Sequence, residues 1–289
     1  MYLVTGGTGT LGRLVVPQLV QAGGKVRVLS RRPRSAAGEG AAEGIEFVAG
    51  DLDTGQGIDA AVAGAEVIVH CAGGRKGDGD KARTLVRAAS RAEGAGAPHL
   101  VNISVTGADR VPQDGRLDRA MFGYFGMKLD AERVIAGSGL PWTTLRATQF
   151  YDLLLMVARA MARLPVIPAP SGVRFQPVDA GEVAARLAEL ALGPPSGLVP
   201  DLAGPRIYPM ADLVRGYLRA AGKRRAVVPV PLPGRAAQAV RDGANLAPER
   251  AVGRSLLARC REIGDSSQVH GTFRPGDRRL IFGLYGPGN

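Results

Sequence analysis

A glycine-rich turn near the start of the chain constrains the fold more than any other feature. It follows a short apolar segment, precedes an amphipathic helical pattern and carries glycines at positions 6, 9 and 12. Glycine is needed where a Cβ would block a tight turn or the approach of a pyrophosphate, and the N–H groups of the following helix point at that anion. The turn therefore predicts a dinucleotide-binding βαβ unit. Its expected cofactor contacts are Gly6, Thr8, Gly9, Thr10, Leu11 and Gly12.

Short apolar runs rich in Val, Ile and Leu alternate with helical patterns up to about residue 148. This alternation is typical of a parallel sheet covered by helices, so we predict an α/β chain with a Rossmann-type, doubly wound parallel sheet. The expected strands are 1–4, 25–29, 45–49, 66–71, 99–104 and 142–147. The expected helices between them are 11–22, 57–63, 80–94 and 124–138, with long polar loops at 33–44 and 109–123.

The pattern changes after residue 150, where Pro and Gly punctuate shorter elements. We expect a Rossmann domain over 1–150, a small substrate lobe over 151–263 with some elements returning to the sheet, and a tail at 264–289 whose structure the sequence does not define. The lobe should contain helices at 151–163, 180–192, 210–221, 233–243 and 248–262. It should also contain strands at 173–178 and 226–230 and a Pro-rich turn at 164–170.

Several classes of protein do not fit the sequence. The apolar runs fall far short of the roughly 20 residues that cross a bilayer, so no membrane span is expected. The N-terminus enters a strand directly instead of carrying a secretion signal, which predicts a cytoplasmic protein. The cysteines and histidines lack metal-ligand spacing, so neither a metal site nor a disulfide framework is expected. These residues are Cys71, Cys260, His70, His99 and His270.

The formal net charge of +11 raises the question of a nucleic-acid partner, because a basic face attracts phosphates. The basic residues are spread along the chain, however, and the longest run is Lys223-Arg224-Arg225. A scattered pattern favours solvated surface residues over a nucleic-acid interface. We therefore expect a small-molecule substrate, and the sequence leaves the oligomeric state open.

The end of the second expected strand indicates which dinucleotide the site prefers. An NAD site usually carries an acidic residue there for the ribose hydroxyls, but this chain has Ser30, Arg31 and Arg32. A hydroxyl and two guanidinium groups favour a 2′-phosphate through charge-assisted hydrogen bonds. NADP(H) is therefore expected over NAD(H), with Arg13 as an additional cation nearby. The alternative is that these arginines only face solvent.

A tyrosine and a lysine four residues apart, Tyr124 and Lys128, fall on one face of an expected helix. A nearby ammonium favours the phenolate, so the phenol can donate a proton to a carbonyl oxygen as hydride arrives. Ser104, at the end of the preceding strand, could hold the same oxygen by a hydrogen bond, with Thr106 as a substitute. Tyr124 also lies in an apolar aromatic stretch, and so could instead be a packing residue.

These motifs together resemble the atypical, NmrA-like NAD(P)H-binding branch of the short-chain dehydrogenase/reductase superfamily. The resemblance extends to about residue 260. It rests on the turn at 5–12, Gly50-Asp51-Leu52, Cys71-Ala72-Gly73-Gly74, Ser104, Tyr124-x-x-x-Lys128 and Leu145-Arg-Ala-Thr-Gln-Phe150.

The resemblance implies further site residues. Asp51 and Leu52 would contact the adenine, and Ala72 and Gly73 would line a ribose. Lys128 would bind the nicotinamide ribose. Gln149 and Phe150 would lie near the nicotinamide and the substrate. The sequence alone also allows Asp51 to be a turn residue and Phe150 to be a core aromatic.

The resulting hypothesis is an NADPH-dependent reductase that transfers hydride to a carbonyl, a quinone or a conjugated small molecule. Two alternatives keep the same glycine turn: a non-catalytic NADP(H)-sensing regulator of the NmrA type, and a non-redox biosynthetic enzyme. Some members of this branch have lost the tyrosine, whereas Tyr124 and Lys128 are both present here. Their presence favours chemistry over sensing, although the substrate cannot be identified from the sequence.

Overall fold

A computed structural model of the chain describes residues 1–31, 43–74, 77–92 and 96–252. Arg32, Cys260, His270, the tail at 264–289 and most of the expected helix at 248–262 lie outside these residues. The chain divides into two compact units. Unit 1 contains Met1–Val105, Met127–Ala147 and Ala180–Asp201, and unit 2 contains Thr106–Gly126, Thr148–Asp179 and the described residues from Leu202 to Val252.

Unit 1 is built on a seven-stranded sheet with the strand order β3-β2-β1-β4-β5-β6-β9, and all of its strand pairs are parallel. The order reverses between β1 and β4, so the carboxyl ends of these two strands border the crevice where such sheets bind ligands. The predicted Rossmann fold is confirmed. The strands are β1 (Tyr2–Thr5), β2 (Val26–Ser30), β3 (Ile45–Ala49), β4 (Val67–His70), β5 (His99–Val105), β6 (Trp142–Ala147) and β9 (Gly197–Leu198).

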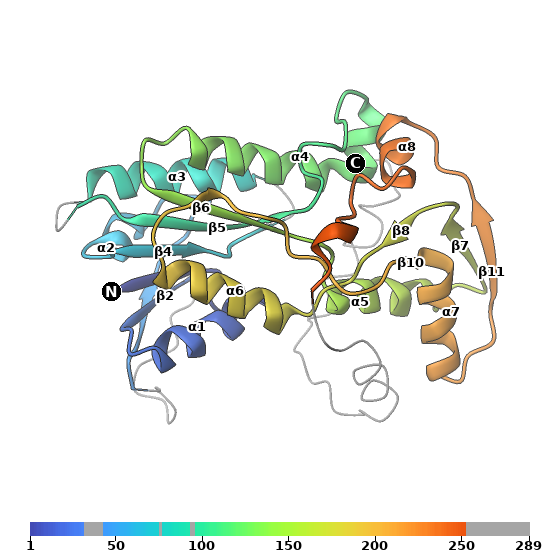
Figure 1. Cartoon of the computed structure of the whole chain (residues 1–289), viewed down its shortest axis with the longest axis horizontal. Helices are drawn as coiled ribbons and strands as arrows, with labels where there is room; N and C mark the ends of the chain where they lie inside the picture. Colours follow the sequence, from blue (N-terminus) through green and yellow to red (C-terminus); the bar gives the residue numbers. More distant parts are fainter. Residues whose placement is uncertain (32–42, 75–76, 93–95, 253–289) are drawn as a thin grey trace. The chain divides into compact units, whose positions relative to one another are not determined.

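Helices cover both faces of this sheet, and Figure 1 shows α1 and α6 on one face and α3 and the later part of α4 on the other. Paired residues of adjacent parallel strands point to the same face, and Leu3, Ile68 and Leu100 are paired in this way. These three side chains form one hydrophobic core with residues of α2, α3 and α4, such as Leu85 and Ile135. The helices are α1 (Gly12–Gln21), α2 (Ile58–Val62), α3 (Asp78–Arg91), α4 (Arg116–Ala136) and α6 (Ala180–Leu192).

Unit 2 contains two small sheets and a separate apolar cluster. β8 and β10 pair antiparallel, whereas β7 and β11 pair parallel. Ile167 of β7 packs with Met161, Val214 and Leu218 from helices α5 and α7. The elements are α5 (Tyr151–Met161), β7 (Val166–Pro170), β8 (Arg174–Phe175), β10 (Tyr208–Pro209), α7 (Met210–Ala220), β11 (Ala226–Val230), α8 (Arg235–Arg241) and a 3-10 turn at Pro248–Arg250.

Three expectations about local structure need correction. The Pro-rich segment at 164–170 was expected to be a turn, but it contains β7, in which Ile167 and Ala169 are buried on alternate positions. A proline is tolerated in a strand at the edge of a sheet, and in a two-stranded sheet every strand is an edge. The expected loop at 109–123 is also too long, because α4 begins at Arg116. The short strands β9 and β10 were not expected.

Each of the two compact units is assembled from separate stretches of the chain. Residues 106–126 belong to unit 2, and residues 180–201 belong to unit 1. The first turn of α4 is held within unit 2 because the buried carboxylate of Asp118 accepts a hydrogen bond from the backbone N–H of Ala236 at 3.1 Å. In unit 1, β9 pairs with β6, and α6 packs against α1.

A buried ion pair fixes α4 to the sheet of unit 1. Arg146 of β6 donates two hydrogen bonds to Glu132 of α4, at 2.9 and 2.7 Å, and both residues are buried. Removing one partner leaves a buried charge without its counter-charge, which typically costs about 3–5 kcal/mol. We expect Glu132→Leu to lower the free energy of unfolding by about that amount.

The double variant Glu132→Leu/Arg146→Met is the control for this ion pair. It removes both charges, so it should lie within about 1–2 kcal/mol of the wild type. Denaturant unfolding of the three proteins measures both effects. A double variant as unstable as the single one would show that the pair's apolar packing, and not its charge balance, determines stability.

Candidate functional site

The turn between β1 and α1 is closed by its glycines. Gly6 has a φ of +67°, and a Cβ on it would lie 2.7 Å from the backbone nitrogen of Ala72, after β4. Gly12, the first residue of α1, packs so closely on the turn that a Cβ would overlap the carbonyl oxygen of Gly6. Two of the three glycines are therefore required by the packing of the protein itself.

Gly9 differs from the other two because its surroundings are open. A Cβ on Gly9 would approach only the carbonyl oxygen of Gly6, at 3.1 Å, and this oxygen accepts a hydrogen bond from the N–H of Gly9 at 2.9 Å. No side chain caps the start of α1, and its first turn contains no acidic residue. An uncapped helix N-terminus beside an open glycine turn fits a pyrophosphate, which needs N–H donors and room for its oxygens.

The other cofactor contacts expected in unit 1 follow the carboxyl ends of β2, β3 and β4. Ser30 ends β2, and Arg31 is exposed directly after it. One carboxylate oxygen of Asp51 accepts the backbone N–H of Asp53 at 2.9 Å, which closes a local turn. Leu52 is buried in the core of unit 1. Asp51 thus closes a turn, and Leu52 packs in the core. These observations do not test the expected contacts of the two residues with the adenine, which stay predictions.

A buried ion pair, which sequence reasoning missed, orients Lys128. Its Nζ atom lies 3.1 Å from the Oδ2 atom of Asp78, and the two side chains are 9% and 1% exposed. Asp78, in the first turn of α3, also accepts the backbone N–H of Gly74 at 2.9 Å. A Cβ on Gly73 would lie 3.2 Å from the same Nζ atom. The ammonium group is therefore held against the loop expected to line a ribose.

A second polar contact joins β1 and β4 where the strand order reverses. The Oγ1 atom of Thr5 lies 2.7 Å from the Nδ1 atom of His70, and both residues are buried. The pKa of His70 is lowered to about 4, mainly by burial and also by the ammonium of Lys128, while the carboxylate of Asp78 opposes the shift. The imidazole is therefore neutral at neutral pH and serves as a hydrogen-bonding partner of Thr5.

The lowered pKa of His70 predicts a loss of stability in acid. The ordinary pKa of 6.5 applies to the unfolded chain, so the unfolded chain takes up the proton first as the pH falls. The stabilisation is fully present above pH 6.5 and is lost as the pH falls to about 4, by roughly 3 kcal/mol in total. Denaturant unfolding at several pH values measures this loss.

His70→Asn isolates the contribution of His70, because asparagine can still pair with Thr5 but does not titrate. Burial also lowers the pKa of His99, but this shift is common to both proteins and cancels in the comparison. We expect the variant to lose less stability than the wild type between neutral pH and pH 4. Parallel losses in the two proteins would contradict a neutral, buried His70.

The neighbouring thiol is not a candidate nucleophile. Burial raises the pKa of Cys71 to about 12, although the ammonium of Lys128 acts in the opposite direction. A thiol with such a pKa is protonated at neutral pH and reacts slowly. Within the described part of the chain, no group of His, Cys, Asp and Glu side chains could hold a metal ion.

Ser104 lies near the end of β5, as the sequence predicted for a substrate-binding hydroxyl. It is 4% exposed, and its Oγ atom has no hydrogen-bond partner among the described residues. A buried hydroxyl without a partner costs free energy unless something else pairs with it. Ser104 is therefore suited to bind a polar atom of a ligand. Thr106, its expected substitute, is also buried without a partner for its hydroxyl, in unit 2.

The remaining expected site residues belong to unit 2. Tyr124 is 43% exposed, and its ring packs edge-on against Phe125 with the centroids 6.2 Å apart. It lies on α4 one turn before Lys128, as predicted. Gln149 is buried, and both polar atoms of its amide lack partners among the described residues. Phe150 directly precedes α5 and forms an isolated β-bridge with Val178.

No helix among the residues placed by the structure is both long enough and apolar enough to cross a membrane. A family model described as NAD(P)H-binding matches residues 6–153. This match covers the three glycines of the turn and the strands β2, β3, β4, β5 and β6.

Two curated relatives are about equally similar in sequence. The (4-alkanoyl-5-oxo-2,5-dihydrofuran-3-yl)methyl phosphate reductase of Streptomyces griseus is 30% identical over 172 residues, which are 60% of this chain and 56% of that protein. The chain thus spans little more than half of that relative's length. The ceramide reductase of Caulobacter vibrioides is 30% identical over 248 residues, which are 80% of this chain and 74% of that protein.

Solved structures share the fold. An NADPH-dependent quinone oxidoreductase from Escherichia coli, solved with NADPH, superimposes with a TM-score of 0.70 at 22% identity. The superposition covers 86% of this chain and 92% of that chain. At this identity the likeness extends to the fold alone.

Proposed function

The chain belongs to the NAD(P)H-binding family, and on this premise we propose that it is an NADPH-dependent reductase of a small molecule. The observation that carries the proposal is the Asp78–Lys128 ion pair, which holds an ammonium group at the loop after β4, next to the glycine turn. A sensor needs only a cofactor site. A buried, oriented cation near that site gives the chain a means of positioning the nicotinamide ribose and supporting proton transfer.

The proposed reaction reduces a carbonyl, a quinone or a conjugated double bond. Bound NADPH supplies the hydride. Lys128 would donate hydrogen bonds to ribose hydroxyls of the cofactor. For a carbonyl substrate, Tyr124 donates its hydroxyl proton to the carbonyl oxygen while Ser104 holds the same oxygen by a hydrogen bond, and an alcohol results. The buried amide of Gln149 has no hydrogen-bond partner in the described part of the chain, which supports its proposed role as a further contact of the nicotinamide or substrate.

The preference for NADPH over NADH is tested at Arg31. Its guanidinium is exposed directly after β2, where a 2′-phosphate would lie in a dinucleotide fold. A hydrogen bond to a charged group contributes about 1.5–3 kcal/mol, so Arg31→Ala should raise the Kd for NADPH by tenfold or more. The Kd for NADH should change less than about twofold, since NADH lacks that phosphate. An equal loss for both cofactors would contradict the assignment.

The proposal as a whole is tested by titrating the protein with NADPH and following nicotinamide fluorescence. Consumption of NADPH is then measured against quinones, aldehydes and ketones, with a long-chain keto-lipid added because one relative is named a ceramide reductase. Binding followed by oxidation with one acceptor supports the reductase. Binding without oxidation by any acceptor favours the sensor or the non-redox enzyme, and no binding overturns the cofactor assignment.

A further inference from the structure

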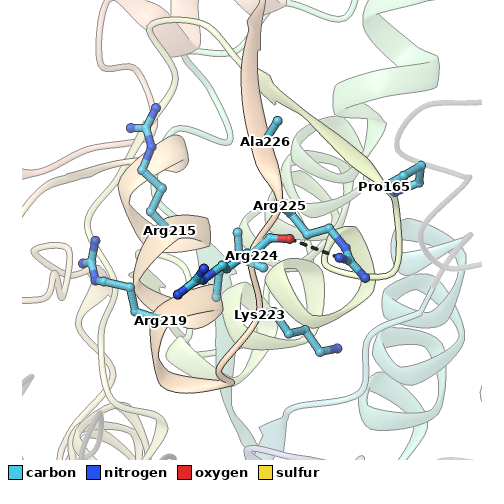
Figure 2. Close-up of a pocket in the computed structure, with 8 residues that line it drawn as sticks. Pro165, Arg215, Arg219, Lys223, Arg224, Arg225 and Ala226 are labelled. Atoms are coloured by element: carbon cyan, nitrogen blue, oxygen red, sulfur yellow. Dashed lines mark hydrogen bonds between the residues drawn. The ribbon is translucent and has the colours of Figure 1, made fainter.

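Unit 2 carries a basic surface hollow that the reductase proposal does not use. We call it the α7 hollow; it has a volume of about 560 Å³ and lies between α7 and β11. Figure 2 shows Arg215 and Arg219 extending from successive turns of α7, with the remaining cations on the segment that leads into β11. Its lining residues are Pro165, Arg215, Leu218, Arg219, Lys223, Arg224, Arg225 and Ala226. Five of these carry a positive charge.

The charges of the α7 hollow are poorly compensated. Arg215 pairs with Asp212 at 3.0 Å on the same helix, in a pair whose side chains are about half exposed. Arg225 donates to the backbone carbonyl of Arg224 (Figure 2), which is not a counter-charge. No carboxylate belongs to the lining among the described residues. Like charges gathered on one surface repel one another, so the arrangement costs folding free energy that a bound anion would offset.

Capping of α7 does not account for these cations. Lysine and arginine often lie at helix C-termini, where they interact with unpaired carbonyls and with the helix dipole. Here the last carbonyls of α7 accept backbone N–H groups instead: Tyr217 from Ala221, Leu218 from Lys223 and Arg219 from Gly222. The side chains of Arg219, Lys223 and Arg224 are thus left available for a ligand.

The arginine side chains of the α7 hollow favour a phosphate ligand. Arginine presents a planar fork of donors that matches phosphate oxygens, and several arginines together suit a ligand with clustered phosphates. The described lining contains no aromatic side chain on which a base could stack, so a single-stranded nucleic acid is not favoured. Next to the hollow, Val166 pairs with Ala226 and is 51% exposed, and Val228 of the same small sheet is 44% exposed.

We propose that the α7 hollow is a second anion site, separate from the glycine turn, that binds clustered phosphate groups. The phosphates can come from a free oligophosphate or from the headgroups of anionic lipids. The exposed valines beside the hollow would contact acyl chains only in the second case. The proposal is independent of the reductase proposal, because none of the α7 hollow residues belongs to the proposed catalytic machinery.

The test uses calorimetric titration with inorganic tripolyphosphate, on protein saturated with NADP⁺ so that the cofactor site is filled. Arg219→Ala/Arg224→Ala should raise the Kd for tripolyphosphate by about tenfold or more, because two charge-assisted contacts are lost. The matched control, Arg87→Ala/Arg133→Ala, removes two exposed arginines from unit 1 and should change this Kd by less than about twofold. Thermal melting confirms that both variants fold.

Sedimentation with vesicles distinguishes the two sources of phosphate. One set contains phosphatidylcholine alone, and the other contains equal parts of phosphatidylcholine and phosphatidylglycerol. If the protein sediments with the anionic vesicles and tripolyphosphate releases it, the ligand is a lipid headgroup. If the protein binds tripolyphosphate but sediments with neither set of vesicles, the ligand is a free anion. If the protein binds neither tripolyphosphate nor anionic vesicles, the proposed second anion site is wrong. It is also wrong if the two double variants lose the same affinity for tripolyphosphate.

Discussion

Replacing Tyr124 by phenylalanine should lower kcat by about 10²- to 10⁴-fold and leave the Kd for NADPH within about twofold. The change removes only the phenol hydroxyl, which is the proposed proton donor, and keeps the ring that packs on Phe125. The side chain is 43% exposed, so the change does not open a cavity in the core. Steady-state kinetics with the best acceptor from the panel gives kcat, and nicotinamide fluorescence gives the Kd.

Tyr2→Phe is the matched control, because it removes the same hydroxyl from a partly buried tyrosine of β1 outside the proposed site. Its kcat should equal that of the wild type. If Tyr124→Phe retains full activity, the proton comes from another group or from water, and Tyr124 is a packing residue of the aromatic stretch. A fall in kcat together with a fall in NADPH affinity would instead point to a disturbed α4.

Asp78→Asn should weaken NADPH binding by about tenfold or more and lower kcat as well. Asparagine keeps an oxygen for the N–H of Gly74, but it removes the charge that holds the ammonium of Lys128. Asp78 is thus a positioning residue that acts through Lys128. Asp80→Asn is the matched control, since Asp80 lies in the same turn of α3 and pairs with Arg83 on the exposed surface. The control should behave as the wild type does.

A double-mutant cycle separates positioning from a general structural role. Lys128→Met should weaken NADPH binding, and adding Asp78→Asn to it should have little further effect, because Asp78 has no ammonium left to orient. Fully additive losses in binding free energy would contradict the coupling. Denaturant unfolding of the same four proteins reports the stability that the buried ion pair contributes apart from binding.

The sequence predicted the sheet well because each strand through β6 is a short apolar run bounded by turn residues. The glycine turn fixed where the sheet begins, and the parallel order followed from the alternation of strands and helices. The predicted start of α4 was wrong because the first turn of this helix is held by a distant residue. The backbone N–H of Ala236 donates a hydrogen bond to the carboxylate of Asp118. The strand β7 was missed because its prolines resemble a turn until the partner β11 is known.

The candidate site was predicted only in part, for a related reason. Gly6 and Gly12 lie between β1 and α1, and Lys128 lies one turn after Tyr124 on α4, so local patterns identify these residues. Asp78 was missed, since an acidic residue in the first turn of a helix ordinarily indicates only a favourable interaction with the helix dipole. The sequence Gly77-Asp78-Gly79, which follows the loop expected to line a ribose, was the available signal for a site residue. Its pairing with Lys128 spans 50 residues, and no local pattern specifies such a contact.

The most direct measurement for the central claim is isotope transfer from NADPH carrying deuterium at the reactive position of the nicotinamide. After turnover with an accepted aldehyde or ketone, whose carbonyl carbon keeps the transferred deuterium in a bond that does not exchange with water, mass spectrometry locates the label. The reductase account predicts that the transferred deuterium is found in the reduced product and that Tyr124→Phe slows its appearance. If the product forms without deuterium while labelled NADPH is recovered unchanged, the reaction is not a hydride transfer from this cofactor, and the account is contradicted.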